Sequence, residues 1–154
     1  MLRNIQVALL CIALMVVAVV GYHYSDKFFD DTFSSSRSVI HIEDVTLSVE
    51  IANTDELRKK GLGGRESLPL RQGMLFPFET TDYHGIWMRD MLMNIDIIWV
   101  SEEMRVVGIE SDVSPQTYPK VFRPSVPVRY VIEVSAGDAD MFGVNVGDVV
   151  TLPW

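Results

Sequence analysis

Apolar and polar residues alternate along much of the chain after residue 38, in short segments separated by turn-forming residues. In residues 45–51, VTLSVEI, the four odd-numbered side chains are apolar. Successive side chains of a strand point to opposite faces, so this pattern predicts a strand with one buried face. Residues 39–42, VIHI, are a second extended segment, and Glu43-Asp44 between the two predicts a β-hairpin.

Other short apolar segments bounded by turn residues predict further strands. They lie at residues 73–78, 86–88, 95–100, 104–110, 128–134 and 144–152. Proline cannot donate to a strand ladder, so Pro77 is expected to mark an edge or an end of its strand. Residues 113–127 contain four prolines and are expected to form a long loop.

Two short helices are predicted between these strands. One follows a cap at Asn53 or Thr54 and ends at Gly61, and the other runs from a cap at Ser135 to Gly143. Short strands dominate, and they do not alternate regularly with helices. We therefore predict a mainly β (β-rich α+β) fold, a small closed or partly closed antiparallel barrel with two short helices.

The N-terminal segment is apolar. Residues 5–22 form an 18-residue run in which Gln6 is the only polar side chain before Gly21. At about 1.5 Å per residue the run approaches the roughly 30 Å of a bilayer core. Arg3 precedes it and acidic residues follow it, so the positive-inside rule keeps the N-terminus in the cytoplasm. We expect residues 1–22 to be a signal anchor, one transmembrane helix, with a cleaved signal peptide as the alternative.

This interpretation makes residues 23–38 a juxtamembrane linker and residues 39–154 an extracytoplasmic domain whose first partner is the membrane. The net charge is −8, and the charges of the first 38 residues cancel, so the domain carries all of it. Nucleic acids and anionic lipids need basic patches, which disfavours both as partners. The only cysteine is Cys11 in the apolar run, so the domain has no disulfide and no thiolate ligand. No cofactor is implied.

Four phrases in this order resemble a known family: RKKGLGGRESLP, GMLF, WMRDMLMNIDIIWV, and RYVIEV followed by FGVNVGDVV. They are similar to the loop, strand and WM-K-N-T segments of the widespread domain-of-unknown-function family 192, over about Val45 to Leu152. The resemblance implies a compact, β-barrel-like domain that is often exported and has no established activity. The chain departs from the family pattern at Gly63, at residues 89–91, where Lys-Asn-Thr is usual, and at Asn94, where proline is usual.

Asp96 is the most informative candidate residue. It lies in NIDIIWV, residues 94–100, where both alternating faces are otherwise apolar, which predicts a central strand. A carboxylate buried there has to be paired or neutralised. We expect either an ion pair with Arg65, Arg89 or Arg129, or a ligand-binding or acid–base carboxylate with a shifted pKa.

The other candidate ligand-binding residues are Arg65, Trp87, Arg89, Asp90 and Tyr118. Arg65 lies in a glycine-rich loop, and its planar fork suits a carboxylate or phosphate; alternatively, it ties the loop to Asp96 or Glu66. Trp87 is amphipathic and suits a ligand site or the core. Arg89 and Asp90 are expected where the strand leaves the core, at the rim of a groove shared with Arg65 and Trp87. Tyr118, in the proline-rich loop, could close over that groove or simply pack its loop.

A metal site is the weaker alternative. Met88, Met91 and Met93 lie near His84 in the sequence, and Met and His are ligands of Cu(I). Methionines at this density more often fill a core.

The chain also lacks a recognisable catalytic set. No nucleophile elbow is present, and Arg129 and Glu133 are expected to pair on one strand face. The leading hypothesis is therefore a binding domain for a small polar or anionic molecule, or for an envelope partner. The alternatives are a hydrolase or lyase that uses Asp96 as acid or base, with Glu133 as a possible second carboxylate, a Cu(I) site, or a purely structural assembly role.

Overall fold

The structure, a computed structural model, describes residues 37–154. The predicted anchor and the linker up to residue 36 lie outside the described residues. Within residues 37–154, no helix is long and apolar enough to cross a membrane. The elements of this part of the chain are β1 (Ser38–Ile42), β2 (Val45–Ile51), α2 (Asp55–Lys60), β3 (Gln72–Asp82), β4 (Ile86–Trp87), β5 (Ile95–Val100), β6 (Val106–Val113), η1 (Pro115–Thr117), β7 (Val121–Phe122), β8 (Val128–Ser135), α3 (Asp138–Met141) and β9 (Val150–Thr151).

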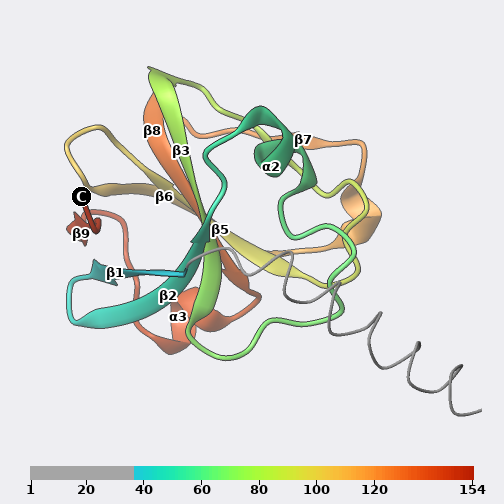
Figure 1. The fold of residues 1–154 in the computed structure, drawn as a ribbon, viewed down its shortest axis with the longest axis horizontal. Coiled ribbons are helices and arrows are strands. Elements are labelled where there is room, and N and C mark those ends of the chain that lie inside the picture. The colour runs from blue at the N-terminus through green and yellow to red at the C-terminus, as the bar shows by residue number, and fades with distance from the viewer. Residues whose placement is uncertain (1–36) are drawn as a thin grey trace, which may run out of the picture. The chain divides into compact units, whose positions relative to one another are not determined.

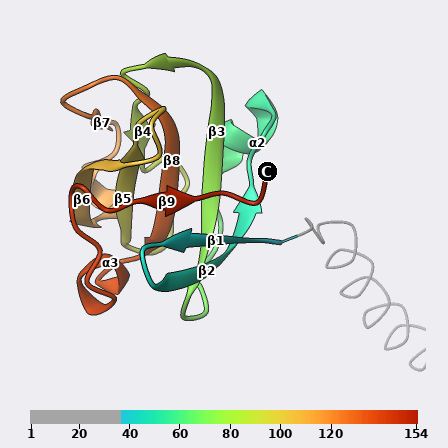
Figure 2. The ribbon, with the colours of Figure 1, turned by 90° about the vertical axis from the view of Figure 1, so that its left-hand side faces the viewer.

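Seven of the strands form one sheet in the order β6-β5-β8-β3-β2-β1-β9, and β4 and β7 form a separate two-stranded ribbon. Figure 1 shows the sheet curled into a half barrel, with α2 and α3 far apart on it. At one end, Arg105 bridges to Val149, and the Val106 N–H donates to the Asp148 carbonyl at 2.9 Å. This contact brings the start of β6 to the chain that leads into β9 (Figure 2). The prediction of a mainly β, partly closed structure with two short helices is thus confirmed.

One pairing differs from the predicted antiparallel barrel. β2 and β3 run parallel, with Ser48 to Ile51 opposite Gln72 to Leu75. Parallel neighbours cannot be joined by a tight hairpin. The segment between them, with α2 and the glycine-rich loop, supplies the crossover connection, and this segment also forms one wall of the site described below.

The sheet has an apolar cluster on each face. The two buried carboxyl groups of its central strands, Asp96 and Glu133, lie on different faces. Ile98 belongs to the first cluster, whereas Ile97 and Val131 belong to the second. Side chains alternate along a strand, so Asp96 shares the face of Ile98, and Glu133 shares that of Val131. Asp96 and Glu133 therefore lie on opposite faces, and a mechanism that pairs them as two carboxylates is excluded.

The helix ends were predicted in part. Thr54 caps α2 with its side chain, and Gly61 ends the helix with a φ of 49°, as expected for glycine. The prediction that Ser135 caps the second helix is wrong, because α3 starts after Gly137, which makes no side-chain cap. β3 also continues through Pro77. Its pairing with β2 has already ended there, so the missing N–H breaks no bond on that side.

Candidate functional site

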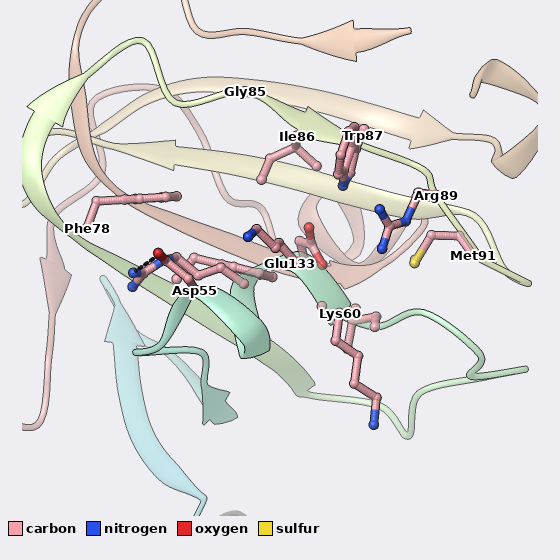
Figure 3. A pocket seen from close by; sticks show the side chains of 14 residues that line it. Asp55, Lys60, Phe78, Gly85, Ile86, Trp87, Arg89, Met91 and Glu133 are labelled. Atoms are coloured by element: carbon pink, nitrogen blue, oxygen red, sulfur yellow. Dashed lines mark hydrogen bonds and ion pairs between the residues drawn. The ribbon is translucent and has the colours of Figure 1, made fainter. Parts of the chain in front are cut away.

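A pocket of about 200 Å³ lies between α2, the chain around β4, and the second-cluster face of the sheet. Figure 3 shows α2 on one side of the pocket, with Trp87 and Arg89 on the other. Its apolar lining comes from Leu62, Phe76, Phe78, Ile86, Trp87 and Met91. Charged side chains of α2, Arg89 and Glu133 complete it, so the pocket combines apolar walls with a few polar groups, as ligand sites do.

Glu133 forms the floor of this pocket. It lies in the middle of β8, opposite Met74 of β3 and Ile97 of β5, and only 5% of it is exposed. Its carboxyl group points into the pocket (Figure 3). A Cβ atom on Gly61 would lie 3.8 Å from its Oε2, so the glycine leaves room beside the carboxyl group. Burial raises the pKa of Glu133 to about 8, so at neutral pH the group is a neutral carboxylic acid that can donate a hydrogen bond.

Arg89 and Trp87 lie on the wall opposite α2 and face the Glu133 carboxyl group. The Arg89 guanidinium carbon lies 5.2 Å from the centroid of the Trp87 ring, a cation–π arrangement, and its Nε is 3.3 Å from Asp90 Oδ2. Figure 3 shows the Arg89 guanidinium and the Trp87 indole nitrogen pointing toward Glu133. Trp87 is 41% exposed, and Tyr118 meets its ring edge-on at 6.4 Å between centroids. Both predicted residues, Trp87 and Arg89, line the pocket, and Tyr118 adjoins it through Trp87.

The α2 wall carries an internal ion pair. Arg58 donates to Asp55 at 2.7 Å, and this hydrogen bond lowers the pKa of Asp55 below its ordinary value. The two charges offset each other. Lys59 and Lys60, at the end of the helix, also line the pocket. Asp90 does not line this pocket. It lines an adjoining hollow, which shares the two lysines.

Asp96 is fully buried, and no arginine among residues 37–154 forms an ion pair with it. Its carboxylate accepts backbone N–H groups from Asp112 and Gly137 at 2.9 Å and from Ala139 at 3.0 Å. The expected ion pair with an arginine is therefore wrong, because main-chain donors at the start of α3 and in β6 satisfy the charge instead. Burial and the charge of Asp96 also raise the pKa of the neighbouring Asp138. Asp96 fixes α3 to the sheet and does not line the pocket, which counts against an acid–base role for it.

Arg65 and Arg129 also have partners other than those expected. Arg65 donates to both carboxylate oxygens of Glu50, at 2.7 and 2.6 Å, and this pairing raises the pKa of Arg65. Arg65 ties its loop to β2 and does not line the pocket. The prediction that Arg65 shares a groove with Trp87 is therefore wrong. A guanidinium nitrogen of Arg129 lies 3.7 Å from a carboxylate oxygen of Glu102. The expected pair with Glu133 is absent because four residues along a strand span about 13 Å.

The methionines of the copper alternative pack as apolar side chains. Met88 and Met91 are buried, and Met93 packs against the same cluster. The ring of His84 stacks on Phe78 at 3.7 Å, and its Nε2 donates to a backbone carbonyl at 2.7 Å. No group of three His, Cys, Asp or Glu side chains within residues 37–154 could hold a metal ion. Core filling accounts for the methionines.

From the sequence, Glu133 is expected only as a possible second carboxylate or as a partner of Arg129, and not as a ligand-binding residue. Its strand, VRYVIEV, shows the same signal as that of Asp96, one carboxylate among apolar neighbours. The two residues differ in what packs over the sheet face on which each lies. α2 and β4 leave a pocket over Glu133, whereas α3 encloses Asp96. That difference depends on tertiary packing and not on strand periodicity.

The solved structures that resemble this chain include the following two. A Sinorhizobium meliloti protein, described as a candidate transcription regulator, is 26% identical with a TM-score of 0.69, and the match covers 75% of this chain and 92% of that one. A protein of unknown function from Novosphingobium aromaticivorans is 27% identical with a TM-score of 0.68, and the match covers 75% of this chain and 83% of that one. No curated protein matches the chain.

The family resemblance expected from the four sequence phrases is confirmed. The model of the family DUF192, described as "Uncharacterized ACR", matches residues 38–152, which is nearly all of the described structure. The chain therefore belongs to the DUF192 family.

Proposed function

We propose that the pocket between α2 and β4 binds a small polar or anionic molecule. The observation that carries this proposal is Glu133, a carboxyl group that is 5% exposed and points into a pocket instead of into the core. Burying such a group without a partner is unfavourable, and a folded protein retains such an arrangement most readily where a site needs it. The positive charges of Arg89 and Lys59 favour an anionic ligand, although the chain as a whole carries −8.

The size of the pocket limits the ligand. Sites for drug-sized molecules have volumes of roughly 300–1,000 Å³. A pocket of about 200 Å³ suits a smaller molecule, or the end group of a larger one. The exposed rings of Trp87 and Tyr118 would extend the contact surface beyond the pocket.

A ligand screen tests this function directly. The full-length protein in detergent micelles is titrated with small organic acids, amino acids, sugars and phosphates, and melting temperature is recorded as a function of concentration. A ligand of the folded state raises the melting temperature by mass action. Trp87→Ala is expected to abolish the shift, whereas Leu92→Ala, a change at an exposed residue outside the pocket, is expected to leave it intact. If no compound acts, or if the shift survives Trp87→Ala, the pocket is not the binding site.

We further propose that the domain is held at a membrane with its C-terminal part outside the cytoplasm. The apolar run of residues 5–22, preceded by Arg3, supports this proposal. Full-length protein is expected in the membrane fraction and resistant to carbonate extraction. Release of a protein shortened by about 21 residues would instead support a cleaved signal peptide.

A further inference from the structure

We propose, building on the function proposed above, that the ligand is a small monocarboxylate with an apolar, ring-bearing body. Its carboxylate would lie between the Glu133 carboxyl group and the Arg89 guanidinium, with its body against Trp87. The supporting geometry is the placement of an acid at the floor of one small pocket and a guanidinium on its wall (Figure 3).

The hydrogen-bonding capacity of the two groups selects an oxyanion. A neutral carboxylic acid presents an O–H donor and a carbonyl acceptor, whereas a guanidinium presents several N–H donors and no acceptor. A ligand atom that meets both the Glu133 O–H and the Arg89 guanidinium must therefore be an acceptor. A carboxylate accepts at both oxygens, carries the charge that complements Arg89, and can share a single proton with the carboxyl group of Glu133.

The apolar part of the lining disfavours a second charge on the ligand. Leu62, Phe76 and Ile86 offer no polar side chain to such a group, and burying an unpaired charge against them is strongly unfavourable. The other charged lining residues all lie on α2; they are Asp55, Arg58, Lys59 and Lys60. The apolar side chains, with Trp87, favour an apolar body, and aromatic walls favour a ring. The pocket volume of about 200 Å³ is too small for a nucleotide or an oligosaccharide.

The proton on Glu133 makes binding depend on pH. The charged groups that face it come from α2 (Asp55, Arg58, Lys59 and Lys60) and from Arg89, whereas its neighbours on β3 and β5 are uncharged. Asp55 and Arg58 form an ion pair with each other. Loss of the Glu133 proton would place a second negative charge beside the ligand carboxylate, and the two would repel each other. Affinity for a carboxylate is therefore expected to fall as pH rises through about 8.

Isothermal titration calorimetry of the full-length protein in detergent micelles tests this, with benzoate as the probe and benzamide as its neutral counterpart of similar shape. We expect benzoate to bind at pH 6.5, to bind at least tenfold more weakly at pH 9.5, and to bind at least tenfold more tightly than benzamide at pH 6.5. Glu133→Gln keeps a donor of similar size but cannot ionise, so benzoate affinity should change less than twofold between the two pH values.

Variants at two arginines separate the site from general charge effects. Arg89→Gln is expected to weaken the binding of benzoate at least tenfold and that of benzamide less than twofold. Arg65→Gln removes the same charge outside the pocket and is expected to change neither affinity. If benzamide binds as well as benzoate, or if benzoate affinity in the wild type does not depend on pH, the carboxylate inference is overturned. In that case, a screening hit that Trp87→Ala abolishes still supports the pocket as a ligand site. If no compound in the screen binds, the proposed function itself fails.

Discussion

Replacing Glu133 with glutamine should stabilise the protein at alkaline pH. In the folded state the pKa of Glu133 is about 8, whereas its ordinary value is 4.5. Between these two pH values the unfolded chain has released the proton and the folded chain still holds it. The unfolded state therefore binds fewer protons, so the free energy of unfolding falls as pH rises through this window, and the loss is complete above pH 8. At about 1.4 kcal/mol per pKa unit, the loss amounts to about 5 kcal/mol.

Glutamine cannot ionise, so Glu133→Gln should not show this loss. Urea denaturation followed by tryptophan fluorescence at pH 4.5, 6, 7.5 and 9 gives the free energy of unfolding of both proteins. The free energy of unfolding of the variant, relative to that of the wild type, should rise progressively from pH 4.5 to pH 8, by up to about 5 kcal/mol. Above pH 8 this difference should not increase further. Glu79→Gln, at an exposed glutamate, is the matched control and should show a constant difference. If the difference for Glu133→Gln is equally constant, its carboxyl group is not buried as described, and the reasoning fails.

Three further substitutions test the fold around the pocket. Asp96→Asn should destabilise the protein by about 3 kcal/mol, since an amide cannot accept all three backbone N–H groups, and a loss below about 1 kcal/mol in urea denaturation would contradict that account. Arg65→Ala should lower stability by about 1–2 kcal/mol through the loss of its two hydrogen bonds to Glu50, with unchanged benzoate affinity by calorimetry. Gly73→Ala should destabilise by at least about 2 kcal/mol, because its Cβ would lie 2.4 Å from the Glu133 carbonyl oxygen, and a wild-type melting temperature would refute the tight packing of β3 on β8.

Local patterns in the sequence predicted the local structure well. The β1–β2 hairpin, the helix after Thr54 and its end at Gly61, and the fully buried strand around Asp96 all depend on neighbouring residues. Alternation also indicated correctly that Asp96 lies inside. The parallel pairing of β2 with β3 could not be read in this way, because it is fixed by how the crossover through α2 packs and not by either strand's own pattern.

The partners of charged residues could not be predicted from strand patterns alone. Asp96 is satisfied by backbone groups that include Gly137, 41 residues further along the chain, and main-chain donors leave no sequence signature. Arg65 pairs with Glu50 across two neighbouring segments that only the fold brings together. Trp87 and Arg89 line the pocket. Glu133 was considered only as a second carboxylate or as a partner of Arg129, because its position in the pocket depends on how α2 and β4 cover the sheet.

The central claim is that a protonated carboxylic acid lies at the floor of a ligand pocket. The most direct test is the pH titration of the Glu133 side-chain carboxyl carbon by ¹³C NMR, assigned by its absence in Glu133→Gln, without and with saturating benzoate. The account predicts a midpoint near pH 8 in the free protein and a higher midpoint with benzoate, since a bound carboxylate favours the protonated acid. A midpoint near the ordinary value of 4.5, unchanged by benzoate, would contradict it.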